Sequence, residues 1–308
     1  MNRNDEPATA PAEASTCYLV DASIYVFRAW FTLPDHLVGR DGTPINALLG
    51  FTDFVAELLR RTEAQQIAFA FDESLTRSFR NEIYPAYKAN RPPAPEALKC
   101  QFAQCRRFLN LLGIQAYGSD RYEADDLLGT LSVRARANGH RVTLVTADKD
   151  LTQLVGAHDE WWDFARGRRF GPREIEKKFG VRPDQIADCL ALAGDKIDNI
   201  PGVPGVGMAT AAKLLRRFGT VDALLTDTAA ISRMQIRGAK RLQALIEAHT
   251  ETIVLARRLT AIECATDLAE TREFGFAAAD PEPLRAWLDE VGFSQPRQQR
   301  WLAWLASR

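Results

Sequence analysis

Aspartates follow directly after the hydrophobic runs in the first half of this sequence. Asp21 follows the run 17–20, Asp72 follows the run 66–71, and Asp148 follows the run 141–147. Between and after these runs, residues 46–61, 96–112 and 124–138 carry apolar side chains at helical spacing. Strands that alternate with helices predict an α/β fold over residues 17–170, with a mostly parallel central sheet flanked by helices.

The positions of these aspartates indicate where a functional site lies. The carboxyl ends of parallel strands meet at one edge of a sheet, and sites in open α/β sheets lie beyond that edge. Each aspartate alone is equally typical of the N-cap of a following helix. Three of them at strand ends, with Glu123, Asp125 and Asp126 opening a predicted helix, favour a shared site over capping.

Further acidic residues accompany this set. Asp150 lies two residues beyond Asp148, and Asp195 and Asp198 form a cluster later in the chain. Like charges repel, so a fold that gathers them needs a counter-charge. Hard divalent cations such as Mg²⁺ prefer oxygen ligands, and two of them roughly 3.5–4 Å apart form the clamp that cleaves phosphodiester bonds.

The second half, residues 171–308, is predicted to be helical. Gly202–Gly207 precedes a predicted helix over 209–217, and such a hairpin presents backbone N–H groups to a phosphate. Lys213 on that helix would add positive charge toward a nucleic-acid backbone. Three tryptophans near the end of the chain are expected in a core or an interface rather than on a base-stacking platform: Trp287, Trp301 and Trp304.

Composition is that of an ordinary globular protein, with 46% hydrophobic and 26% charged residues and a net charge of −1. No apolar run approaches the roughly 20 residues that span a bilayer. Five scattered cysteines without CxxC spacing favour a reducing cytoplasm. Residues 1–16 have neither a signal peptide nor a transit peptide pattern, and we expect a disordered tail. Seven basic residues between Arg77 and Arg107 predict a basic face beside the acidic site.

Taken together, eight short segments resemble the 5′-nuclease family, which includes the N-terminal domain of bacterial DNA polymerase I, phage 5′-exonucleases and flap endonucleases. The resemblance runs from about Tyr18 to Phe293. Its segments, in order, are Leu19-Val20-Asp21, Phe71-Asp72, Ser78-Phe79-Arg80, Tyr87-Lys88-Ala89-Asn90-Arg91-Pro92, Glu123-Ala124-Asp125-Asp126, Thr146-Ala147-Asp148-Lys149-Asp150, Gly194 to Gly202 and Val203-Pro204-Gly205-Val206-Gly207.

The resemblance implies a PIN-like nuclease fold with two metal groups. The first-metal carboxylates would be Asp21, Asp72, Glu123 and Asp125, and those of the second metal would be Asp148, Asp150 and Asp198. Asp126 and Asp195 match further acidic positions near the second site. The ions would be Mg²⁺, with Mn²⁺ as a substitute.

The resemblance also implies residues that contact DNA. A helix–two-turn–helix over about 190–218 would hold the duplex backbone, with K⁺ at the Gly202–Gly207 hairpin. Lys88 and Arg91 would contact the scissile phosphate, and Tyr87 would stack on a terminal base. The full set of expected DNA-binding residues is Arg77, Arg80, Tyr87, Lys88, Arg91, Gly202, Val203, Gly205, Val206, Gly207 and Lys213.

Two positions depart from the family pattern. Ala22 stands where relatives usually carry glycine, so its methyl group either crowds an approaching phosphate or is harmless. Met208-Ala209-Thr210 replaces Glu-Lys-Thr after the hairpin and removes one basic residue. All nine carboxylate positions are retained, so we expect an active enzyme.

The implied function is a two-metal 5′-3′ exonuclease and flap endonuclease in replication and repair. Its substrates would be 5′-flap, nicked or frayed duplex DNA, and we expect a cytoplasmic, nucleoid-associated monomer with a functional link to a DNA polymerase. One alternative is a weakly catalytic module that binds branched DNA, for which the carboxylates would be dispensable. Another is a ribonuclease, against which the duplex-binding hairpin argues.

Overall fold

The computed structural model describes residues 15–73, 77–268 and 274–308. The expected disordered tail therefore lies outside the described residues, apart from its last two. Ser15 accepts a hydrogen bond from the backbone N–H of Arg141, and the first strand begins at Thr16. The α/β part thus starts within the segment that was expected to be tail.

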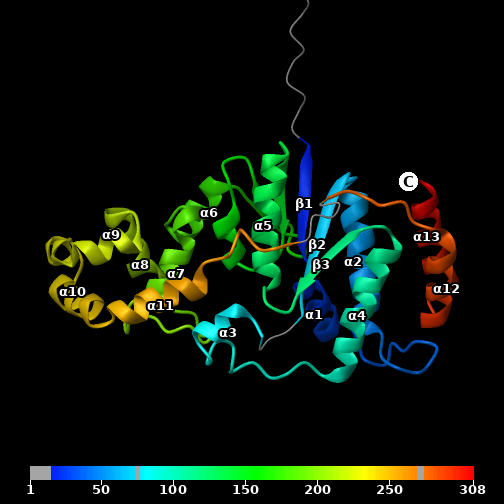
Figure 1. The fold of residues 1–308 in the computed structure, drawn as a ribbon, viewed down its shortest axis with the longest axis horizontal. Coiled ribbons are helices and arrows are strands. Elements are labelled where there is room, and N and C mark those ends of the chain that lie inside the picture. Colours follow the sequence, from blue (N-terminus) through cyan, green and yellow to red (C-terminus); the bar gives the residue numbers. More distant parts are fainter. Residues whose placement is uncertain (1–14, 74–76, 269–273) are drawn as a thin grey trace, which may run out of the picture.

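The centre of the molecule is a six-stranded sheet in the order β3-β2-β1-β4-β5-β6 (Figure 1). Four of its strand pairings are parallel, and only β6 runs antiparallel to its neighbour β5. The prediction of a mostly parallel sheet is confirmed. The strands are β1 (Thr16–Asp21), β2 (Gln66–Asp72), β3 (Gln115–Ser119), β4 (Arg141–Val145), β5 (Glu160–Asp163) and β6 (Arg168–Phe170).

Helices cover both faces of the sheet, as the buried side chains of β2 illustrate. Ile67, Phe69 and Phe71 pack on one face with α1 (Ala22–Thr32), α2 (Asn46–Thr62) and α4 (Glu96–Leu111). Ala68 and Ala70 face the other way, into the core that contains α5 (Ala124–Ala137). Because successive strand residues point to opposite faces, the alternation of aromatic and alanine residues gives β2 one bulky and one flat face.

The second half contributes a helical lobe beside the sheet (Figure 1, green to orange). Helix α11 packs against α7, and α7 packs against α8. The predicted helix after the Gly-rich hairpin is confirmed as α8, which ends where Gly219 adopts a left-handed φ of 82°. The lobe consists of α6 (Pro172–Phe179), α7 (Ile186–Ala193), α8 (Met208–Phe218), α9 (Val221–Thr226), α10 (Ala239–Ala248) and α11 (Thr250–Thr260). Short 3₁₀ turns occupy Asp150–Leu154, Pro183–Gln185 and Thr228–Arg233.

The closing helices α12 (Pro281–Val291) and α13 (Gln295–Ala306) lie across the sheet from this lobe (Figure 1, red). Trp287 stacks on Phe108 of α4, and Trp301 meets the same ring edge to face. The expectation that these two tryptophans are core residues is confirmed. Residues 281–308 therefore pack with the α/β core, in contrast to the sequence-based boundary that grouped them with the helical half.

Within the described residues, no helix is both long and apolar enough to cross a membrane.

We predict that Trp287→Ala lowers the free energy of unfolding by about 3–5 kcal/mol, because its side chain is fully buried and the lost volume leaves a cavity. Chemical denaturation measures the loss, with Arg285→Ala on the exposed face of α12 as the matched control. A loss below about 1 kcal/mol would show that α12 is not part of the cooperative core.

Candidate active site

The strand register brings three aspartates to one edge of the sheet. Strand β1 lies between β2 and β4, and Asp21 pairs with Ala70 while Val20 pairs with Val145. Asp72 ends β2, and Asp148 follows β4 after two residues. The prediction that these carboxylates share the carboxyl edge of one sheet is therefore confirmed.

Two of these aspartates also hold local structure. Asp21 accepts the backbone N–H of Ile24 at the start of α1 and the hydroxyl of Thr146 at 2.9 Å. Asp72 accepts the backbone N–H of Ala124, which opens α5, at 2.9 Å. Asp21 thus caps the helix that follows it, whereas Asp72 bonds the start of a helix distant in the chain. These bonds orient the carboxylates toward the same edge and are compatible with a shared site.

Helix α5 delivers two more carboxylates to this edge. Glu123 is its N-cap and Asp125 lies in its first turn. Burial, together with the charges of Asp148 and Asp21, raises the pKa of Asp125 well above its usual value. Burial and the neighbouring Asp72 raise the pKa of Asp21 to about 7. Burial and neighbouring carboxylates therefore both oppose ionisation at this edge.

Asp148 and Asp150 form the next pair. The backbone N–H of Asp150 donates to Asp148 Oδ1 at 2.8 Å, and the indole of Trp161 donates to the carbonyl of Asp148. Asp150 Oδ1 is buried without a hydrogen-bond partner. Burial and the charge of Asp148 raise the pKa of Asp150 to about 7. A buried acceptor without a donor is costly unless a cation approaches it.

The last two acids lie in a tight turn, Asp195–Ile200, which we call the acidic turn. Its ends exchange two backbone hydrogen bonds, Asp195 N–H to Ile200 O and Ile200 N–H to Asp195 O. Asp195 Oδ1 accepts the backbone N–H of Ile197, and Oδ2 accepts Lys149 Nζ at 3.0 Å. Burial opposes ionisation, but Lys149 outweighs it and lowers the pKa of Asp195. Asp195 therefore shapes the turn that presents Asp198.

Arg80 and Asp126 depart from their predicted roles. The Arg80 side chain is 3% exposed, and its guanidinium forms two 2.7 Å bonds with the Asp126 carboxylate. It also donates to Glu123 and to the carbonyls of Leu259 and Ala261. Arg80 is thus a buried structural residue in this structure rather than a DNA contact. Asp126 neutralises it and is not free to serve as a metal ligand.

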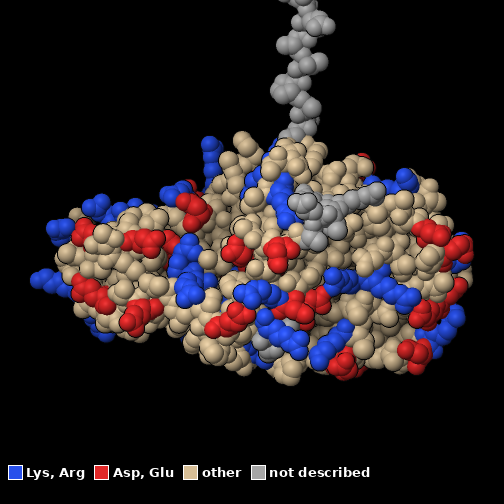
Figure 2. Space-filling view, in the orientation of Figure 1, with Lys and Arg blue, Asp and Glu red and all other residues tan. Residues whose placement is uncertain are grey.

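Residues Tyr84–Arg91, which we call the basic segment, cover the carboxylates. Lys88 Nζ lies 2.5 Å from Glu123 Oε1 and 3.8 Å from Asp198 Oδ2, and Arg91 pairs with Asp198. Burial opposes ionisation of Glu123, but Lys88 and Arg80 outweigh it and lower its pKa. Figure 2 shows Lys and Arg side chains surrounding the acidic residues in the middle of this face. The predicted proximity of both basic residues to the site is confirmed.

Tyr87 lies differently from the prediction. It is 4% exposed, and its hydroxyl donates to Glu123 Oε2 at 2.9 Å. The ring packs on Ala191, Ile200, Ala256 and Leu259. A ring that is buried in this way offers no face to a terminal base, so in this structure Tyr87 orients Glu123.

The donor set fits a hard divalent cation in its chemistry, because it consists of carboxylate oxygens. Burial and mutual repulsion raise the pKa values of several of these carboxylates. Across residues 15–73, 77–268 and 274–308, no three acidic, histidine or cysteine side chains converge closely enough to hold an ion as they stand. Lys88 and Arg91 lie among the acids instead. Ions would therefore have to draw the carboxylates together and compete with these two cations.

The Gly-rich hairpin lies between α7 and α8. Val203 and Val206 are buried, so only their backbone could face a ligand. A Cβ atom on residue 202 would lie 2.3 Å from the backbone nitrogen of Gly194. This distance is too short for any side chain, so only glycine fits at position 202. Gly205 has a φ of 80°, and Gly207 has open space at its Cα. Lys213 is exposed on α8.

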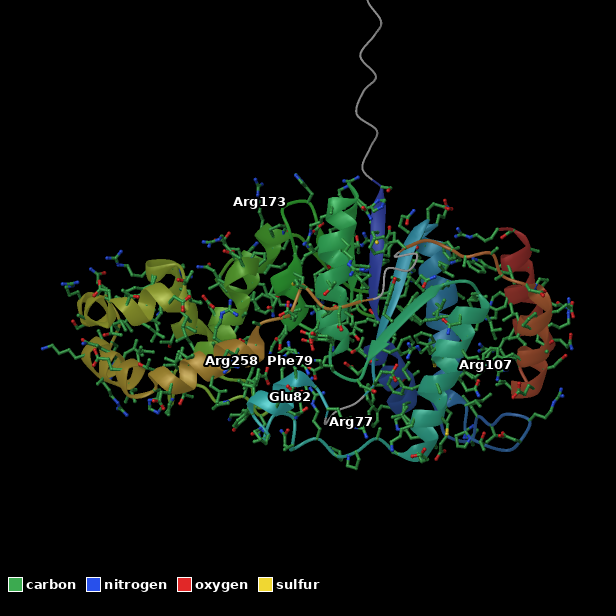
Figure 3. The ribbon with its side chains drawn as sticks, in the orientation of Figure 1. Arg77, Phe79, Glu82, Arg107, Arg173 and Arg258 are labelled. Atoms are coloured by element: carbon green, nitrogen blue, oxygen red, sulfur yellow. The ribbon has the colours of Figure 1, made fainter. Side chains whose placement is uncertain are left out.

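Arg77 and Ala22 complete the set of positions singled out from the sequence. Arg77 is exposed and precedes α3 (Phe79–Ile83), with exposed Arg258 of α11 on the other side of that helix (Figure 3). Ala22 is fully buried in the core with α1 and α2. Its methyl group therefore faces the core and does not crowd the approach to the carboxylates.

Comparison with known families settles which family this fold and this site represent. Residues 16–180 match the model of the 5′-3′ exonuclease N-terminal resolvase-like domain, and residues 181–282 match that of the 5′-3′ exonuclease C-terminal SAM fold. The chain belongs to the 5′-3′ exonuclease family. Members of this family are nucleases that hydrolyse phosphodiester bonds.

Curated relatives of this family member are DNA polymerases. The chain is 38% identical over 282 residues to DNA polymerase I of Bacillus caldotenax, covering 89% of this chain and 31% of that protein. It is 35% identical over 280 residues to the thermostable DNA polymerase I of Thermus thermophilus, covering 89% and 32%. The chain thus spans about a third of the length of these relatives.

Solved structures share the fold. A T5 5′-exonuclease with bound zinc has a TM-score of 0.64 at 19% identity, covering 95% of this chain and 98% of that one. The catalytic core of Rad2 in complex with a DNA substrate has a TM-score of 0.62 at 16% identity, covering 95% and 92%. At these identities the likeness supports the fold.

Several residues that orient the carboxylates were not singled out from the sequence. Ser23 accepts the backbone N–H of Asp72, and Thr146 donates to Asp21. Asn199 donates its side-chain amide to the carbonyl of Ala86 at 2.7 Å. The adjacency of Asn199 to Asp198 was the one available hint, because a polar residue beside a predicted ligand is well placed to orient it.

We predict that Asp150→Asn stabilises the metal-free protein at pH 8 by the order of 2–4 kcal/mol. The folded-state pKa of Asp150 is raised to about 7 from 3.8. Wild-type stability is therefore lost as pH rises from about 4 to 7, because only the unfolded chain ionises this carboxyl freely. The asparagine variant lacks this loss.

Thermal denaturation in EDTA at pH 4 and pH 8 measures the effect. The matched control is Asp184→Asn, an exposed acid that pairs only with Arg182. Equal melting temperatures of wild type and Asp150→Asn at pH 8 would contradict the raised pKa.

Proposed function

We propose that this protein is a divalent-metal-dependent 5′-3′ exonuclease and flap endonuclease acting on DNA. The observation that carries the proposal is the position of Asp21, Asp72 and Asp148 at the carboxyl ends of three neighbouring strands, β1, β2 and β4. Lys88 of the basic segment pairs with Glu123 beside them. Family membership supports the reaction class, which is phosphodiester hydrolysis. The zinc in the related T5 structure and the DNA in the Rad2 complex support the metal and the substrate.

The carboxylates would hold two Mg²⁺ ions, with Mn²⁺ as a substitute. Asp21, Asp72, Glu123 and Asp125 would hold the first ion. Asp148, Asp150 and Asp198 would hold the second. When bound, the ions would supply an activated water and balance the charge on the attacking and leaving oxygens. The raised pKa values of Asp21 and Asp150 support a need for such charge.

Lys88 and Arg91 would bind the scissile phosphate. Lys88 now pairs with Glu123, and Arg91 pairs with Asp198. When DNA binds, each cation would leave its carboxylate and pair with a phosphate oxygen. Cations held in place at the reacting group stabilise the charge that develops there without reorganisation. A phosphate that occupied this position would lie between the basic segment and the acids.

Duplex DNA would lie along the helical lobe. The backbone N–H groups at the Gly202–Gly207 hairpin, with K⁺, would hold one strand, and Lys213 would add charge. A flapped, nicked or frayed 5′ end would then reach the carboxylates beneath the basic segment. The polymerase relatives support work beside a DNA polymerase in replication and repair. The protein would act as a cytoplasmic monomer.

We predict that wild-type protein cuts a 5′-labelled flap duplex near the junction in Mg²⁺ and does not cut in EDTA. Asp148→Asn should lower kcat by at least about 10³-fold, because it removes a charge from the centre of the carboxylate set. The matched control Asp184→Asn should cut at the wild-type rate.

Tight binding of flap DNA without cleavage, in both Mg²⁺ and Mn²⁺, would instead indicate the branched-DNA binding module. Faster cleavage of an equivalent single-stranded RNA than of flap DNA would indicate the ribonuclease. Unimpaired cleavage by Asp148→Asn would reject the metal-dependent mechanism.

A further inference from the structure

The basic segment and the acidic turn contact each other through an unusual pair of residues. Lys88 has a φ of 54° and Asn199 a φ of 55°, two of three non-glycine residues with positive φ in the described parts of the chain. Asparagine tolerates the left-handed region, whereas lysine adopts it at a cost. Such conformations persist only where surrounding contacts enforce them, and they concentrate at functional sites.

Three hydrogen bonds supply the enforcing contacts. The backbone N–H of Lys88 donates to the carbonyl of Asp198 at 3.0 Å. The side-chain amide of Asn199 donates to the carbonyl of Ala86 at 2.7 Å. The amide of Asn90 donates to the carbonyl of Lys196 at 3.0 Å. Each bond runs between the basic segment and the acidic turn, so the two segments form one unit.

This unit fixes where the two cations stand. The backbone N–H of Lys88 bonds Asp198, and the lysine side chain lies near Glu123 and Asp198. Arg91 of the same segment also pairs with Asp198. Asn199 is half-buried, and its side-chain amide bonds the carbonyl of Ala86, two residues before Lys88. This bond therefore limits the movement of the backbone next to the lysine. The bond from Asn90 is exposed, and water can replace it more readily.

We propose that Asn199 is a positioning residue that fastens the basic segment to the acidic turn and thereby places Lys88 and Arg91 over the carboxylates. Its left-handed backbone turns the side-chain amide toward Ala86, and the hydrogen bond holds the segment in place. The assignment rests on the proposed function only for its effect on catalysis. The fastening itself is a property of the protein without metal or DNA.

The first experiment measures the fastening directly, by limited trypsin digestion of the metal-free protein. Trypsin cuts after Lys88, whose side chain is only 9% exposed in the fastened segment. Asn199→Gly keeps the left-handed backbone easily but lacks the amide, and Asn199→Asp keeps the shape but presents an acceptor to the Ala86 carbonyl. Both variants should be cut after Lys88 about tenfold faster, which is the effect of one lost hydrogen bond on the open population.

The matched control is Asn110→Asp, the same change on the exposed face of α4. It should be cut after Lys88 at the wild-type rate. An unchanged rate in both Asn199 variants would overturn the proposal. Equal acceleration at every lysine and arginine, with a lowered melting temperature, would also overturn it, because Asn199 would then serve general stability.

The second experiment is a double-mutant cycle on flap cleavage, with Asn199→Gly as one change and the pair Lys88→Met and Arg91→Met as the other. If Asn199 acts through these two cations, its substitution lowers kcat in the wild type and has little further effect in the background that lacks both. Losses that multiply in the combined variant would overturn the proposal. If the protein cleaves no substrate, the proposed function fails. The trypsin digestion still tests whether Asn199 holds the basic segment to the acidic turn, so the two failures can be told apart.

Discussion

Electrostatic repulsion among buried carboxylates is the constraint around which this molecule is arranged. The parallel sheet brings acids from β1, β2 and β4 to one edge, and burial strengthens their repulsion. Basic side chains of the protein neutralise part of that negative charge. Arg80 pairs with Asp126, Lys149 with Asp195, and Lys88 with Glu123. Asp150 Oδ1 accepts no hydrogen bond and has Lys149 Nζ only at 3.9 Å, so this acid is well suited to a divalent ion.

The sequence pattern predicted the parts of the site that depend on local order. Hydrophobic runs followed by aspartate placed Asp21, Asp72 and Asp148 correctly, because a parallel sheet has only one carboxyl edge. The helix after the Gly-rich hairpin was equally predictable, since glycine marks both of its ends. These inferences required only spacing and residue type.

Arg80 and Tyr87 show where such inference stops. Their partners lie far along the chain, with Glu123 contacting both and Leu259 separated from Arg80 by 179 residues. A basic or aromatic residue in a segment that covers an active site looks the same in sequence whether it faces DNA or the interior. Only the packed structure distinguishes the two, as it does for the closing helices, whose apolar faces did not reveal that they would pack on α2 and α4.

The burial of Arg80 has a mechanical consequence. One guanidinium joins the start of α5, which carries Glu123, to the carbonyls at the end of α11 in the helical lobe. Tyr87 makes a second link of this kind, because it donates to Glu123 and packs on Leu259 of α11. The end of α11 cannot shift relative to the start of α5 without breaking these buried, charge-assisted hydrogen bonds. The helical lobe and Glu123 are therefore expected to move together.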